Sequence, residues 1–238
     1  MKRLNYILIF FAVFTNCMFS QLDIGVHAGL TINSGKLEAQ ATFMPPFYPE
    51  PTLRDVELGI KSISTFSFGG LIETKLYSFL YFQAEVNYLD KKIIPRDFIF
   101  FDGISWTTWA RHIKYSFKYI EVPLLLKIKF DCEKFLPYCF AGVGIGLLYK
   151  ATETMFDFGY TWEGDPPAEL SISQFTKYEQ PFVTFGAGTD YQLSDMFSIF
   201  ITMRYSNALV DIAKARNVFF KPHNYDLLLG IKTRIINY

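Results

Sequence analysis

Apolar and polar residues alternate with a period of two in eight separate segments of the chain. In the clearest of them, between residues 120 and 130, every second side chain is large and aliphatic or aromatic, while Glu121, Lys127 and Lys129 fall between them. Successive side chains of a β-strand point to opposite faces, so this period predicts strands with one apolar and one polar face. The predicted strands are centred on residues 23–33, 65–73, 82–88, 120–130, 141–149, 183–191, 197–205 and 226–235.

The connections between these segments are alternately short and long. Short ones lie near Tyr77, Phe135 and Ser194, and long ones cover residues 34–57, 91–111, 152–177 and 211–224. Outer-membrane barrels have short periplasmic turns and longer extracellular loops. The pattern therefore predicts an all-β fold, a closed antiparallel transmembrane β-barrel of about eight strands with four long extracellular loops. A soluble barrel or sandwich is the alternative, but the polar face here also carries many glycines, which suits a narrow lumen better than a solvent face.

The start of the chain resembles an export signal. Lys2 and Arg3 precede a short apolar stretch over residues 4–14, and Ser20 precedes Gln21. These features predict a cleaved signal peptide over residues 1–20 and a barrel domain over residues 21–238. An uncleaved anchor is the alternative, but the apolar stretch is shorter than the roughly 20 residues that span a bilayer. We therefore expect the protein in the outer membrane of a Gram-negative cell.

Composition agrees with strands that face lipid. Hydrophobic residues make up 50% of the chain and aromatic residues 18%, yet no later apolar run is long enough for a transmembrane helix. A closed barrel is the other structure that satisfies backbone hydrogen bonds within a bilayer. The 23 basic and 23 acidic residues create no basic field, which argues against nucleic acid as a partner. The expected partners are outer-membrane lipid, lipopolysaccharide and the barrel assembly machinery.

Cys132 and Cys139 flank residues 133–138, which we interpret as a tight hairpin. If the turn lies midway between the two cysteines, their side chains face each other on neighbouring strands. A disulfide would then form in the oxidising periplasm. The alternative is two free thiols that face lipid or the periplasmic rim, and the sequence leaves both open.

The polar faces of the predicted strands place charges of both signs in the lumen. Because an eight-strand barrel is only about wide enough to be filled by its own side chains, opposite charges there are expected to pair and fill the interior. A narrow ion pathway is the alternative. The predicted lumen charge network comprises Asp23, His27, Glu73, Glu85, Glu121, Lys127, Lys129, Asp190, Arg204, Lys232 and Arg234.

The predicted outer loops are rich in aromatic residues. They either pack on one another as a cap or form a docking surface for another envelope protein, because exposed apolar patches usually mark interaction sites. The candidate docking residues are Phe98, Phe100, Trp106, Trp109, Phe156, Tyr160 and Trp162.

Catalytic chemistry finds little support in the sequence. The outer-rim candidates for a lipid-modifying barrel enzyme are His112, His223 and Ser206, but such residues are common at strand ends without any chemistry. The sequence contains no phosphate-binding glycine loop, metal-ligand spacing or nucleophile elbow. We expect no enzyme activity, no cofactor and no metal.

Two neighbouring segments and one near the start are similar to a known family. Residues 119–127 read Tyr-Ile-Glu-Val-Pro-Leu-Leu-Leu-Lys, residues 136–142 read Leu-Pro-Tyr-Cys-Phe-Ala-Gly, and residues 25–30 read Gly-Val-His-Ala-Gly-Leu. They resemble the PorT-like outer-membrane β-barrel proteins, whose layout the chain matches over residues 22–238. The founding member is linked to type IX protein secretion and the maturation of secreted proteases. The resemblance implies a barrel without catalytic residues, in which Glu121 and Pro123 are structural.

Together these observations favour a non-enzymatic outer-membrane barrel that scaffolds or docks an envelope partner, with a link to protein secretion or surface assembly. A narrow outer-membrane channel is the first alternative, and a lipid-modifying enzyme is the second.

Overall fold

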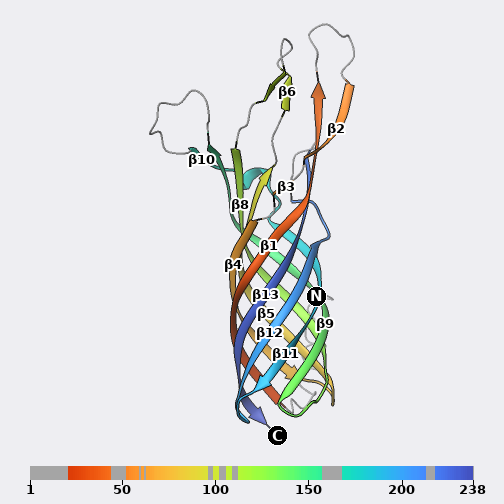
Figure 1. Ribbon diagram of the computed structural model, residues 1–238, viewed down its shortest axis with the longest axis vertical. Helices are drawn as coiled ribbons and strands as arrows, with labels where there is room; N and C mark the ends of the chain where they lie inside the picture. Colours follow the sequence, from red (N-terminus) through yellow and green to blue (C-terminus); the bar gives the residue numbers. More distant parts are fainter. Residues whose placement is uncertain are drawn as a thin grey trace, which may run out of the picture.

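The computed structural model describes residues 21–43, 52–58, 60–61, 63–95, 99–101, 106–108, 112–156, 168–212 and 218–237. Within these residues, eight long strands pair antiparallel in chain order, and the last pairs with the first to close a barrel (Figure 1). The fold predicted from the alternation is therefore confirmed. The barrel strands are β1 (Gln21–Phe43), β4 (Ile63–Lys75), β5 (Leu80–Pro95), β8 (His112–Lys129), β9 (Phe135–Phe156), β11 (Glu179–Gln192), β12 (Phe197–Ala208) and β13 (Val218–Asn237).

The smaller elements lie on the side of the barrel opposite the short turns (Figure 1). Strand β2 (Thr52–Leu58) extends β1 as a hairpin, β3 (Ile60–Lys61) pairs with β5, and β10 (Ala168–Ser171) pairs with β9. Strands β6 (Ile99–Phe101) and β7 (Trp106–Thr108) pair with each other, and a 3-10 turn, η1, covers Ser173–Phe175. No helix among the described residues is long and apolar enough to cross a membrane.

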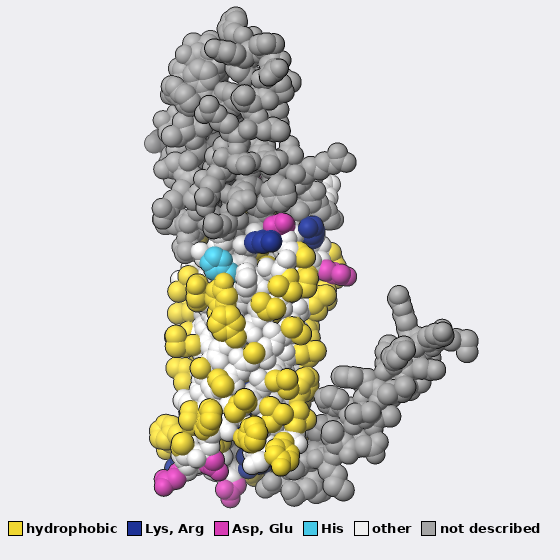
Figure 2. All heavy atoms as spheres, turned by 90° about the vertical axis from the view of Figure 1, so that its right-hand side faces the viewer, with side chains coloured by type: hydrophobic (Ala, Val, Ile, Leu, Met, Phe, Trp, Pro, Cys, Tyr) yellow, Lys and Arg dark blue, Asp and Glu magenta, His cyan; other side chains and the backbone are white. Residues whose placement is uncertain are grey.

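Apolar side chains cover the outer wall of the barrel (Figure 2). Val26, Val143 and Leu229 each expose more than half of their surface, which is the reverse of a soluble core. Aromatic residues gather toward both ends of this apolar belt. Tyr77, Phe79, Phe130, Phe135 and Phe197 lie near the short turns, and Phe66, Tyr149, Tyr178 and Tyr225 lie near the loop side. Such paired girdles mark the two interfaces of a membrane-spanning barrel.

The lumen is packed by large rings set against glycines. A Cβ atom at Gly144 would collide with the ring of Phe182, and one at Gly186 would collide with the ring of Phe140. The glycines therefore leave room for side chains that cross the interior from neighbouring strands. This small-against-large packing fills the lumen of a narrow barrel without leaving a wide pore.

The strand pairing contains two irregularities. The register of β8 and β9 shifts between Lys118 and Tyr119. That of β1 and β13 shifts between Leu22 and Asp23, where Leu22 pairs with Ile236 and Asp23 with Arg234. The second shift leaves Ile235 as an extra residue in β13, so the alternation of inward and outward residues changes there.

The turn between β8 and β9 does not bring the two cysteines together. It closes between Cys132 and Phe135, whose backbone groups exchange hydrogen bonds of 3.1 Å, and Glu133 within it has a φ of 57°. Cys139 already belongs to β9 and pairs with Ile128. Both thiols are free and exposed, so the cross-strand disulfide is wrong. The centre of the turn lies closer to Cys132 than to Cys139, so the two cysteines do not face each other across the hairpin.

Candidate functional site

The candidate site is the barrel lumen together with its opening on the short-turn side. Near that opening, Glu73 is shared by Lys127, Lys129 and Lys232, with Nζ–oxygen distances of 3.1 Å to Lys127 and 3.3 Å to Lys232. Asp190 accepts hydrogen bonds from Lys129 at 2.7 Å and from Lys232 at 2.6 Å. We call these five residues the lower ion cluster. All of them are buried, so each charge depends on its partners rather than on water.

A second group of buried polar residues lies deeper in the lumen and is called the middle cluster. The Nη2 atom of Arg204 donates to both oxygens of Glu85, at 2.6 and 2.7 Å. Asn87 donates to the same carboxylate at 2.8 Å, and Gln83 donates to it as well. His27 lies edge-on to the ring of Phe200, with 6.1 Å between centroids. Arg204 and Glu85 belong to β12 and β5, so their ion pair crosses the barrel from one wall to another.

Two further charged residues, which are not part of the predicted network, also lie in the lumen. Lys91 forms an ion pair of 2.7 Å with Glu121 and donates to Gln180 at 3.0 Å. Asp226 accepts a hydrogen bond of 2.7 Å from Thr31. Lys91 keeps the parity of Glu85 and Asn87 along β5, which is the signal that would have placed it inside.

The charges of the lumen balance. Among the described residues, six carboxylates face six basic groups across the interior. The carboxylates are Asp23, Glu73, Glu85, Glu121, Asp190 and Asp226, and the basic groups are Lys91, Lys127, Lys129, Arg204, Lys232 and Arg234. Every member of the predicted network except Arg234 is buried, and the side chain of Arg234 is 24% exposed and lies 3.5 Å from Asp23.

An apolar cluster fills the lumen on the loop side. Ile93, Phe117 and Leu148 pack there with Tyr119 and Ala151. Ile212, from the segment that follows β12, is also buried in this cluster, and its carbonyl oxygen accepts a hydrogen bond of 2.7 Å from the backbone of Lys177. This part of the chain therefore folds over the barrel and covers its outer end with apolar side chains.

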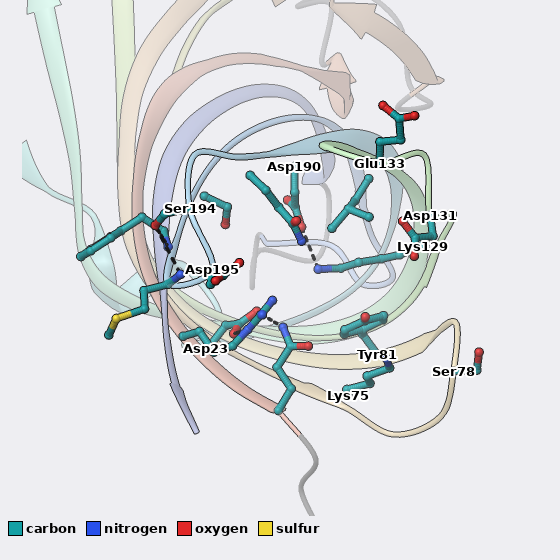
Figure 3. A pocket seen from close by; sticks show the side chains of 17 residues that line it. Asp23, Lys75, Ser78, Tyr81, Lys129, Asp131, Glu133, Asp190, Ser194 and Asp195 are labelled. Atoms are coloured by element: carbon teal, nitrogen blue, oxygen red, sulfur yellow. Dashed lines mark hydrogen bonds and ion pairs between the residues drawn. The ribbon is translucent and has the colours of Figure 1, made fainter. Parts of the chain in front are cut away.

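The short-turn end is open. A pocket of about 340 Å³ lies there, and residues from the three short turns and from the ends of β1 and β13 line it (Figure 3). Asp190 and Lys129 of the lower ion cluster form part of its floor, and Asp131 and Asp195 lie on the turns around it. Within the described part of the chain, no group of three or more histidine, cysteine or acidic side chains is arranged to hold a metal ion.

The remaining sequence candidates do not form a site in the described structure. Ser206 faces the lumen and donates to Thr184 at 3.0 Å, whereas His223 contacts the rings of Tyr205 and Tyr225 on the outer wall, tilted to the first and edge-on to the second. These two candidates therefore point to opposite faces of the sheet. The side chain of His112 and those of the docking candidates Phe98, Phe100, Trp106, Trp109, Phe156, Tyr160 and Trp162 lie outside the described residues.

The family follows from a comparison with family models. The model for the outer membrane protein beta-barrel domain matches residues 16–214. The chain belongs to this family. Membership places it among the β-barrels of the Gram-negative outer membrane, in agreement with the apolar belt. No curated protein sequence matches the chain.

Solved barrels are similar to this one in fold. The outer membrane protease OmpT from Escherichia coli has a TM-score of 0.50 at 10% identity, covering 92% of this chain and 98% of its own. OprG from Pseudomonas aeruginosa has a TM-score of 0.48 at 11% identity, and the match covers 90% of this chain and 96% of OprG. Neisserial surface protein A has a TM-score of 0.46 at 11% identity, and the match covers 90% of this chain and 97% of that protein. At such low identity the likeness to OmpT concerns the fold alone.

Proposed function

We propose that this protein is a non-conducting, non-enzymatic outer-membrane barrel that docks an envelope partner at its ends. The observation that carries the proposal is the filled lumen. Paired charges occupy its lower and middle parts, and the apolar cluster around Ile93 and Ile212 occupies its outer end. A barrel whose interior is filled in this way offers its two ends and its surface for function.

The filled lumen argues against the channel alternative. Ion conduction needs a continuous file of water, whereas the ion pair of Arg204 with Glu85 and the rings set against Gly144 and Gly186 cross the interior at successive levels. Buried charges that pair with one another also offer a passing ion fewer free partners. The proposal therefore assigns these charges a structural role.

The positions of the candidate nucleophile and base argue against the enzyme alternative. Acyl transfer by a serine needs a base within hydrogen-bond reach of its hydroxyl group. Ser206 instead donates to Thr184 in the lumen, while His223 contacts two tyrosine rings on the outer wall. The proposal for this reason assigns no catalytic residue and no cofactor.

The loop side supports the docking role. Strands β8 and β9 are paired as far as His112 and Phe156, and the aromatic loops named above adjoin these two strand ends, so the loops start from a hydrogen-bonded base (Figure 1). Lipid and lipopolysaccharide surround the belt in this proposal, and the barrel assembly machinery inserts it. The resemblance of residues 119–127 to the PorT-like proteins supports a partner from protein secretion or surface assembly.

Site-specific photo-crosslinking in intact outer membranes tests the proposal. A crosslinking residue at Phe100, Trp106 or Phe156 is expected to capture one envelope protein in stoichiometric yield, identified by mass spectrometry. The same residue at Leu229, which lies in the apolar belt, is the control and should capture lipid only. Recovery of lipid and lipopolysaccharide alone from all positions would overturn docking and direct attention to conductance and lipid-turnover assays.

A further inference from the structure

The pocket at the short-turn end is a second place where this barrel can meet a partner. Short turns of outer-membrane barrels face the periplasm, so the pocket opens to that compartment. Its volume of about 340 Å³ is that of a small-ligand site. The pocket is bounded by the turns before β5, β9 and β12 and by Gln21 and Arg234 of the closing strand pair (Figure 3).

Acidic groups outnumber basic groups in the wall of this pocket. Five carboxylates line it against three basic side chains, Lys75, Lys129 and Arg234. Lys129 and Arg234 already pair with buried carboxylates. Among the described ion pairs none involves Asp131, Glu133 or Asp195, the three carboxylates on the turns. The entrance therefore attracts positive charge.

The floor holds hydrogen-bond acceptors without donors. Asp190 is 2% exposed, and its Oδ2 atom accepts from two lysines while its Oδ1 atom has no partner in the described structure. The Oδ1 atom of Asp23 accepts no hydrogen bond either, since the Nε atom of Arg234 lies 3.5 Å away without donating to it. Figure 3 shows both carboxylates directed toward the middle of the pocket. Both oxygens are closed off by neighbouring side chains, so a ligand that donates hydrogen bonds completes them only where those side chains move aside.

The chemical composition of the lining favours one class of positively charged ligand. The described residues form no metal-binding group, which argues against a bare divalent cation. Tyr81, Leu136 and Met196 contribute apolar surface to the same wall. An ammonium or guanidinium group on an aliphatic stem matches this combination, because its stem packs on apolar surface while its head donates to carboxylates.

We propose that the periplasmic pocket binds a lysine or arginine side chain of a periplasmic polypeptide. The charged head enters between the carboxylates of the turns and approaches the floor at Asp23, because Lys129 and Lys232 already surround Asp190. This inference rests on the proposed docking function and gives that function a periplasmic contact of stated chemistry.

Peptide titration followed by methionine methyl NMR tests the pocket in the full barrel in lipid nanodiscs. The probe is acetyl-Gly-Lys-Gly-amide, and acetyl-Gly-Glu-Gly-amide is the probe of opposite charge. Met196 lines the pocket, whereas Met203 lies on the lipid-facing wall and serves as the internal reference. The lysine peptide is expected to shift the Met196 signal to saturation and to leave Met203 unchanged.

The variant D131N/D195N removes two exposed carboxylates and leaves the lower ion cluster intact. It should lower the affinity of the pocket for the lysine peptide by about fivefold, since each exposed charge pair contributes only modestly to binding. The matched control E169Q/E179Q removes two exposed carboxylates from the loop side and should leave the affinity unchanged.

Two results would overturn the inference: an unshifted Met196 signal, or equal shifts from the two peptides. These results are separable from the outer-loop crosslinking. A partner captured at the loops without peptide binding would leave docking in place and remove the pocket from it. Peptide binding without a captured loop partner would support the pocket and reject docking through the loops.

Discussion

Replacing Glu73 with glutamine removes a carboxylate that three buried lysines share. The lower ion cluster holds Lys127, Lys129 and Lys232 against Glu73 and Asp190, so its net charge rises from +1 to +2 in the E73Q variant. Removing one partner of a buried ion pair costs about 3–5 kcal/mol, because the other partner stays desolvated and unpaired. Because three ammonium groups share this one carboxylate, we expect the free energy of unfolding to fall by an amount near the upper end of this range, about 5 kcal/mol.

The free energy of unfolding can be measured by urea titration of the barrel in lipid vesicles, with intrinsic fluorescence as the signal. E169Q is the matched control. Glu169 forms an ion pair of 3.2 Å with Lys150, but the two side chains are 56% and 49% exposed. An exposed pair of this kind contributes less than about 1 kcal/mol, so E169Q should unfold almost as the parent does.

A double variant separates lost pairing from other effects of the substitution. In E73Q/K127M, one lysine leaves together with the carboxylate, and the cluster returns to a net charge of +1. The double variant should recover part of the stability that E73Q loses, because an apolar side chain of similar volume needs no partner. If E73Q instead costs less than about 1 kcal/mol, water screens the lysines, the lumen is hydrated, and the channel alternative gains over the filled barrel.

Three further predictions test other parts of the fold. G144L places a side chain where the ring of Phe182 lies and should destabilise the barrel by about 1–3 kcal/mol or more, measured in the same urea titration. V143R puts a cation on the lipid-facing wall one residue away and should cost about 2–4 kcal/mol if the site lies at mid-belt. Without reductant, both Cys132 and Cys139 should be alkylated, giving two mass increments, and an unlabelled pair would show a disulfide.

The barrel itself could be predicted because lipid and lumen impose opposite polarity on successive residues. Strand ends could not be predicted in the same way. Strand β1 continues to Phe43, although the alternation was followed only to Asn33, and β13 already begins at Val218. A strand outside the bilayer needs no contrast in polarity between its two faces, so its hydrogen bonds can continue where the sequence pattern gives no signal.

The sequence indicated most of the charged residues that face the lumen, but not how the side chains pack there. Lys91 stands between Asp90 and Lys92, so these three charged residues alone do not show which one faces inward, and only its parity with Glu85 and Asn87 does. Tyr119 and Leu125 also face the lumen, where the sequence analysis expected charges and glycines. Their places depend on neighbours from other strands, which a single segment does not contain.

The length of β1 also decides how far the loop side of the barrel extends beyond the membrane. At Ile32 the strand pairs with Tyr225, which lies in the loop-side aromatic girdle, and it then continues for eleven residues to Phe43. With a rise of about 3.3 Å per residue and a tilt of about 40°, these residues reach roughly 28 Å beyond the girdle. That height exceeds the apolar band, about 25 Å, of a typical outer-membrane barrel. A molecule that approaches the barrel from its loop side therefore meets the β1–β2 hairpin before it meets the bilayer.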